Sequence, residues 1–220
     1  GRGLEKLKKE EKDKLIKKRK EMLFYRVSEI HARARLVNEK IRPDLVVCLH
    51  LNASAWKDPE KKELGEPNDF HVLVNGCYMG GELALDDQRF EMMLRLLSGW
   101  HALERELAED VSVSLAKATK LPAFSYKGPN ALKIGKVDGV WARNLLANRL
   151  YRCPVVFLEP YRANSKGAYK RIIAGSYKGV REIEGVRRIP LVDEYAQAVA
   201  EGLVRNFVEL DSNATLPTNP

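Results

Sequence analysis

The sequence has few of the features that mark membrane, disulfide-rich or nucleic-acid-binding proteins. It has no run of about 18 apolar residues, so no membrane-spanning helix is predicted. Its N-terminus is charged and has no signal-peptide pattern, although processing would remove such a segment. Its three cysteines, Cys48, Cys77 and Cys153, show neither metal-ligand spacing nor an even disulfide framework. We interpret them as small buried thiols, with one disulfide as the alternative if the protein is exported.

Positive charge is concentrated at the N-terminus. The formal net charge is +8, and residues 1–22 carry ten Lys and Arg against five Asp and Glu. The rest of the chain is close to balanced. A nucleic-acid-binding protein would need a basic face with aromatic or motif support on its folded part, and the sequence shows none. We therefore interpret residues 1–22 as a charged, solvated helical extension, with contact to an acidic polymer or membrane surface as the alternative.

The apolar pattern predicts alternating helices and short strands. Between residues 12 and 41, apolar residues recur every three, four or seven positions without Gly or Pro, which predicts one long amphipathic helix. The apolar runs Asp44–His50 and Cys153–Glu159 predict strands buried on both faces. The other predicted elements are a strand over Phe70–Val74, helices over about 86–119, with a break at Gly99, and about 191–208, and a short strand or turn over Ala142–Leu146.

These elements predict a single α/β domain with a largely parallel or mixed central sheet flanked by helices. A chain of 220 residues suits one domain of ordinary size. We assign the domain to residues 23–210, after the charged extension and before a flexible polar tail over residues 211–220.

Two of the predicted strands end in ionisable side chains, His50 and Glu159. In open α/β sheets, sites form outside the carboxyl ends of the strands. A histidine and a glutamate that meet there can serve as a metal ligand and a general base. The alternative for His50 is a hydrogen-bonded structural histidine. We predict that the two side chains lie together at one edge of the sheet.

The sequences around these residues contain three motifs in a fixed order. The first is Arg35-Leu-Val-Asn38 followed by Pro43-Asp-Leu-Val-Val-Cys-Leu-His-Leu-Asn-Ala53. The second is Cys153-Pro-Val-Val-Phe-Leu-Glu159, and the third is Tyr195-Ala-Gln-Ala-Val-Ala-Glu-Gly-Leu203. They resemble the R-x-x-x-A-N and A-D-L-F-V-S-I-H-A-N-A segments, the P-A-V-L-V-E strand and the I-A-x-A-I-x-x-G-I helix of zinc-dependent N-acetylmuramoyl-L-alanine amidases. The resemblance covers about residues 26–208.

The resemblance implies a hydrolase that cleaves the amide bond between N-acetylmuramic acid and L-alanine in peptidoglycan. It implies that His50 is a zinc ligand and that Glu159 takes a proton from a zinc-activated water. Asn52 and Arg162 follow these residues closely and are expected to contact substrate, since an arginine suits an anionic stem peptide. The alternative for Asn52 is a plain turn role. A peptidoglycan or muropeptide substrate and a location in the cell envelope, periplasmic or extracellular, follow from the resemblance alone.

The chain departs from the family pattern in three places. The family's other zinc ligands are the histidine of an early G-H-G motif and a glutamate on the first helix, but no histidine precedes Arg26. We expect either a fragment that begins after these ligands, which the charged opening helix favours, or their loss, and weak or no zinc binding by this chain alone. Pro160 and Tyr161 follow Glu159 where the family has x-G-F, and Cys48 replaces a serine.

Two other functions stay open at the level of sequence. One is a different zinc hydrolase, such as a carboxypeptidase or an amidohydrolase with another substrate. The other is a degenerate amidase-like domain that binds a glycan or a partner without cleaving it. His71, within the strand Phe70–Val74, is interpreted as a hydrogen-bonded strand histidine, with a substrate or metal role as the alternative.

Overall fold

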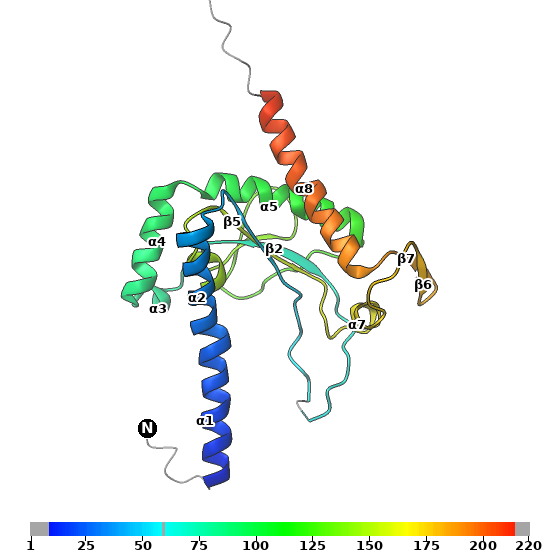
Figure 1. The fold of residues 1–220 in the computed structure, drawn as a ribbon, viewed down its shortest axis with the longest axis horizontal. Helices are drawn as coiled ribbons and strands as arrows, with labels where there is room; N and C mark the ends of the chain where they lie inside the picture. Colours follow the sequence, from blue (N-terminus) through cyan, green and yellow to red (C-terminus); the bar gives the residue numbers. More distant parts are fainter. Residues whose placement is uncertain (1–8, 59, 214–220) are drawn as a thin grey trace, which may run out of the picture.

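The computed structural model describes residues 9–58 and 60–213, which form a single α/β domain around one five-stranded sheet (Figure 1). The first eight residues of the predicted extension and residues 214–220 of the predicted tail lie outside the described residues. Residues 211–213 of that tail continue the last helix. In chain order the elements are α1 (Lys9–Leu23), η1 (Phe24–Ser28), α2 (Glu29–Leu36), η2 (Val37–Ile41), β1 (Val46–Leu49), β2 (Phe70–Val74), α3 (Gly80–Leu83), α4 (Asp86–Ser98), α5 (His101–Thr119), β3 (Leu132–Lys133), β4 (Val140–Ala142), α6 (Leu146–Arg149), β5 (Val155–Pro160), α7 (Lys166–Ile173), β6 (Arg181–Ile183), β7 (Val186–Arg188) and α8 (Leu191–Asn213).

The main sheet has the strand order β1-β5-β2-β4-β3 and is mixed. Strand β5 runs parallel to β1 on one side and antiparallel to β2 on the other. Strand β4 is parallel to β2, and β3 is antiparallel to β4. The predicted α/β class with a largely parallel or mixed sheet is therefore confirmed, in its mixed form. Strands β6 and β7 form a separate hairpin.

The predicted N-terminal helix is present as a continuous rod from α1 to η2 (Figure 1). It ends at Arg42, which adopts a left-handed conformation just before Pro43. Only Ala34 of this rod is buried, and Leu15 and Ile16 are exposed. Its apolar face therefore meets the rest of the described domain only near its C-terminal end, beside Leu150 and Val155.

The helix predicted over residues 86–119 is divided into α4 and α5 at Gly99, which has a φ of +69°. Helix α5 buries Leu107, Val111 and Leu115 against the sheet, as its pattern predicts. Helix α4 does not, because its buried residues are the charged Glu91 and Arg95. Of the apolar residues that the pattern assigns to the inner face of α4, three are instead exposed, Phe90, Met93 and Leu97, and Leu94 is only partly buried.

The two faces of the sheet are covered differently. Helices α5 and α8 pack side by side over one face, and the even-numbered residues of β2 and β5 point into their core. The odd-numbered residues point to the opposite face, where Leu73, Trp141 and Phe157 form a smaller apolar cluster. Because side chains alternate along a strand, His71 and Glu159 lie on this second face.

Strand β1 differs from its prediction. The run Asp44–His50 was predicted to be buried on both faces, but β1 lies at an edge of the sheet, where β5 is its one partner strand among the described residues. Its residues are partly buried, and Leu49 is exposed. The prediction was wrong because a continuous apolar run does not distinguish an edge strand from an inner one.

The described residues contain neither a membrane-spanning helix nor a disulfide. None of their helices is long and apolar enough to cross a bilayer. The three cysteines are free thiols, with Cys153 buried and Cys48 and Cys77 partly buried. Burial raises the pKa of the Cys48 thiol to about 11, which fits a packing role.

Gly202 allows α8 to approach α5 closely. A Cβ atom at this position would lie 2.5 Å from the Cα and 2.8 Å from the N of Val111. We expect Gly202→Ala to lower the free energy of unfolding by about 1–3 kcal/mol, because backbone atoms of α5 would have to move. Urea denaturation followed by circular dichroism measures this change.

Gly167 is the matched control, since it also lies in a helix, α7. A Cβ atom at this position would have only a side-chain amide within 4.0 Å. Gly167→Ala is expected to raise the free energy of unfolding by about 0.5–1 kcal/mol through the better helix propensity of alanine. A Gly202→Ala variant that was stabilised to the same degree would contradict the close packing of α8 on α5.

Candidate functional site

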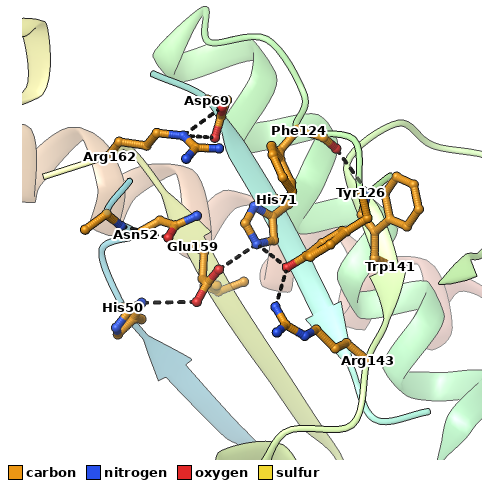
Figure 2. Close-up of polar contacts among 12 residues, drawn as sticks. His50, Asn52, Asp69, His71, Phe124, Tyr126, Trp141, Arg143, Glu159 and Arg162 are labelled. Carbon is orange, nitrogen blue, oxygen red and sulfur yellow. Dashed lines mark hydrogen bonds and ion pairs between the residues drawn. The ribbon is translucent and has the colours of Figure 1, made fainter. Parts of the chain in front are cut away.

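The carboxyl ends of β1 and β5 bring His50 and Glu159 together. The parallel register pairs Leu49 with Leu158, and the His50 N–H donates to the Leu158 carbonyl at 3.1 Å. The two side chains that follow therefore point to the same side, with His50 Nδ1 3.3 Å from a carboxylate oxygen of Glu159 (Figure 2). The structure thus brings together the two side chains that the sequence predicts to meet at one edge of the sheet.

A third side chain, His71, contacts the same carboxylate from the other neighbouring strand. The antiparallel register of β2 and β5 places His71 directly opposite Glu159. Its Nε2 lies 2.6 Å from the second carboxylate oxygen (Figure 2). Glu159 therefore lies between two imidazoles, with side-chain exposures of 52% for His50, 13% for Glu159 and 1% for His71. The site is open on the His50 side and closed on the His71 side.

These contacts fix the charge of Glu159. Burial of the carboxyl opposes ionisation, but hydrogen bonds from His50 and His71 outweigh it and lower the pKa of Glu159 to about 2. At neutral pH Glu159 is therefore a carboxylate. The carboxylate is the form that can accept a proton, and the lowered pKa makes it a weaker base than a free carboxylate while both imidazoles hold it.

An aromatic wall closes the buried side of the site. Phe124 and Tyr126 lie on the segment between α5 and β3, and their ring centroids are 5.0 and 5.4 Å from that of His71. The Tyr126 hydroxyl lies 3.0 Å from His71 Nε2 and accepts a hydrogen bond from Arg143 Nη1 at 3.0 Å. The indole of Trp141 donates to the Phe124 carbonyl at 3.1 Å.

Sequence reasoning did not identify this wall. Phe124, Tyr126 and Arg143 lie outside the three motifs, in segments with no clear apolar period. The available signal was the spacing of Phe124 and Tyr126, since residues two apart in an extended segment point to one side. Sequence reasoning interprets His71 as a structural strand histidine, because the direction of β2 cannot be predicted from its five residues, four of them apolar.

Asn52 and Arg162 lie beside one another just past the strand ends, joined by a bridge in which Asn52 N–H donates to Tyr161 O and Ala163 N–H to Asn52 O. The Asn52 side-chain oxygen accepts from its neighbour Ala53 N–H at 2.7 Å, which is a local turn contact. Their predicted contact with substrate stays a prediction.

The guanidinium of Arg162 already has an anionic partner within the chain. Its Nε donates to both oxygens of Asp69, at 3.0 and 2.9 Å (Figure 2). Its Nη1 donates to the Ser54 hydroxyl at 2.9 Å. The group also lies over the Phe124 ring. An anionic substrate at Arg162 would therefore share the charge of this arginine with Asp69.

The donors at this site do not by themselves complete a zinc site. Among residues 9–58 and 60–213, no group of three or more His, Cys, Asp or Glu side chains could hold a metal ion. The nitrogen-to-oxygen distances at Glu159 are those of hydrogen bonds to two imidazoles. His50, half-exposed, is the side chain here that a metal could reach, and further ligands would have to come from outside these residues.

Comparison with known proteins gives structural neighbours but no sequence family. No family model matches the chain, and no curated protein matches it in sequence. Among solved structures, the N-acetylmuramyl-L-alanine amidase Ami1 from Mycobacterium smegmatis is 19% identical, with 82% of this chain and 61% of that chain covered and a TM-score of 0.47. Ami1 from Mycobacterium abscessus is 20% identical, with coverages of 81% and 61% and a TM-score of 0.45.

An N-acetylmuramoyl-L-alanine amidase from Clostridium difficile 630 is 16% identical, with 84% of this chain and 67% of that chain covered and a TM-score of 0.45. The chain spans about three fifths of the length of the two mycobacterial structures. Solved structures similar to this chain include N-acetylmuramoyl-L-alanine amidases from two mycobacteria and from Clostridium difficile.

Proposed function

We propose that this domain belongs to a hydrolase that cleaves the amide bond between N-acetylmuramic acid and L-alanine in peptidoglycan. The observation that carries the proposal is the convergence of His50 and Glu159, 3.3 Å apart, from two strands whose sequences resemble separate amidase motifs. A shared edge of the sheet is what a common site requires. The proposed location is the cell envelope, where this substrate is found.

In this proposal Glu159 is the catalytic carboxylate. It is ionised, and one of its oxygens faces the open side next to His50. This oxygen takes a proton from the water that attacks the amide carbonyl carbon. The same proton then passes to the nitrogen of the leaving L-alanine, so that the C–N bond breaks and the carboxylate is regenerated.

Zinc is proposed only as a cofactor whose remaining ligands lie outside the described residues. His50 would hold it, and zinc supplies Lewis-acid activation of water and of the carbonyl when it is bound.

Asn52 and Arg162 are proposed to contact the glycan or peptide near the strand ends. The charged segment 1–22 is proposed as an extension of the domain, and residues 211–220 as its tail.

The proposal is tested with the complete gene product that carries this chain. We expect it to release a stem peptide with a free L-alanine amino terminus from purified muropeptides, with one water added per cleavage, as detected by mass spectrometry. Cleavage at a different bond would instead favour a carboxypeptidase or another amidohydrolase. Saturable muropeptide binding without cleavage, in metal-replete buffer, would favour a non-catalytic binding domain.

A further inference from the structure

His71 holds one oxygen of Glu159 inside the protein. The imidazole is fully buried in β2, and its Nε2 lies 2.6 Å from that oxygen. The other oxygen faces His50, whose side chain is half-exposed. The two oxygens of one carboxylate thus have different surroundings, one enclosed by β2 and the aromatic wall and the other near solvent.

The position of the hydrogen on His71 follows from its two nitrogens. Nδ1 is buried and has no hydrogen-bond partner among the described residues. In the neutral ring, only one nitrogen carries a hydrogen. A hydrogen on Nδ1 would be a buried donor without an acceptor, which is costly, and would leave the lone pair of Nε2 facing the carboxylate. A hydrogen on Nε2 avoids both problems.

Two oxygens lie within reach of Nε2, and the distances decide between them. The Glu159 oxygen is at 2.6 Å, and the Tyr126 hydroxyl is at 3.0 Å. The carboxylate is nearer and charged, so it is the stronger acceptor. Tyr126 is itself held by Arg143, and its ring lies edge-on to the imidazole. The wall therefore fixes the ring plane of His71, and the ring fixes the carboxylate.

We propose that His71 is a positioning residue for Glu159: its Nε2–H holds the inner oxygen of the carboxylate and leaves the outer oxygen, beside His50, to take the proton during amide hydrolysis. The inference rests on the proposed function for the role of the outer oxygen, but the hydrogen-bond arrangement does not depend on catalysis. His71 touches no substrate in this account. It acts only through the orientation of Glu159.

The arrangement of the hydrogen is tested by NMR on the protein with ¹⁵N-labelled histidine. His71 is assigned by the loss of its signals in His71→Gln, and His31→Gln serves as the control for an exposed histidine. We expect a protonated-type signal for Nε2 and an unprotonated-type signal for Nδ1 at neutral pH. The reverse tautomer, with the hydrogen on Nδ1, would overturn the proposal whether or not the protein is an amidase.

The role in catalysis is tested by steady-state kinetics of three variants. His71→Leu removes the donor, and we expect kcat to fall about 10- to 100-fold with KM within about twofold, because the carboxylate loses its orientation. His71→Gln retains an N–H donor at a similar reach. Its kcat is expected to be at least about tenfold higher than that of His71→Leu. Tyr126→Phe keeps the imidazole and is expected to lower kcat less than His71→Leu.

These results separate the possible failures. Thermal unfolding verifies that each variant folds. If His71→Leu does not fold, the proposal is still tested by the kcat of His71→Gln relative to the wild type and by the tautomer of His71 measured by NMR. A folded His71→Leu variant with wild-type kcat would overturn the positioning role. A wild-type protein that cleaves no muropeptide but shows the expected tautomer would refute the proposed function and leave the hydrogen-bond arrangement standing.

Discussion

Replacing Glu159 by glutamine is expected to lower kcat for muropeptide cleavage by about 10²- to 10⁴-fold, with little change in KM. Glutamine has nearly the same shape and can still accept a hydrogen bond from His71, but it cannot take up a proton from water. The loss should therefore be confined to the chemical step. Initial rates over a range of muropeptide concentrations measure kcat and KM separately.

The control for this substitution is Glu201→Gln, which removes an exposed carboxylate of α8 far from the site in the sequence. It is expected to leave both kinetic constants unchanged. Circular dichroism and thermal unfolding of both variants show whether the fold is retained. Full activity in a folded Glu159→Gln protein would end the assignment of Glu159 as the catalytic carboxylate.

Glu104→Ala is expected to give the largest loss of stability among single substitutions in the helices around the sheet. Glu104 is buried on α5, where it pairs with the buried Arg95 of α4 and accepts the Val155 N–H at 2.7 Å. Its removal leaves a buried guanidinium and the first N–H of β5 without this acceptor. We expect the free energy of unfolding to fall by about 3–5 kcal/mol. Urea denaturation measures this change.

An exposed pair provides the matched control. Lys170 and Glu184 also form an ion pair, but both side chains are about half exposed. Glu184→Ala is therefore expected to cost less than about 1 kcal/mol. The double variant Arg95→Met/Glu104→Leu should recover much of the loss, because it removes both buried charges together. A loss below about 1 kcal/mol for Glu104→Ala would show that the pair is solvated in solution.

The sequence was a good guide where one rule of packing dominates. The apolar runs before His50 and Glu159 predict strands, and the rule that sites form at the carboxyl ends of such strands predicts that the two side chains meet, as the structure shows. The glycine within the helical pattern predicts the break at Gly99, and the structure shows this residue in a left-handed conformation that ends α4. In each case a few neighbouring residues contain the information.

The remaining features depend on partners that are distant in the sequence. The five residues of β2 do not reveal that the strand runs antiparallel to β5, and this direction is what places His71 opposite Glu159. The buried charges of α4, Glu91 and Arg95, cannot be predicted from an apolar period, because each is buried only with its own counter-charge. Tyr126 joins the site through a loop whose course no local pattern specifies.

Glu159 lies within strand β5 rather than in a loop. Strand β2 pairs with β5 at Glu159 itself, and β1 pairs with β5 up to the preceding residue, Leu158. The backbone at this carboxylate is therefore immobilised when the domain folds, and no ordering entropy is left to be lost each time a substrate binds. Differences in rate or selectivity between related chains would then arise in the segments that surround the strand ends, such as residues 52–58 and 60–69. The reacting group itself would stay where the sheet holds it.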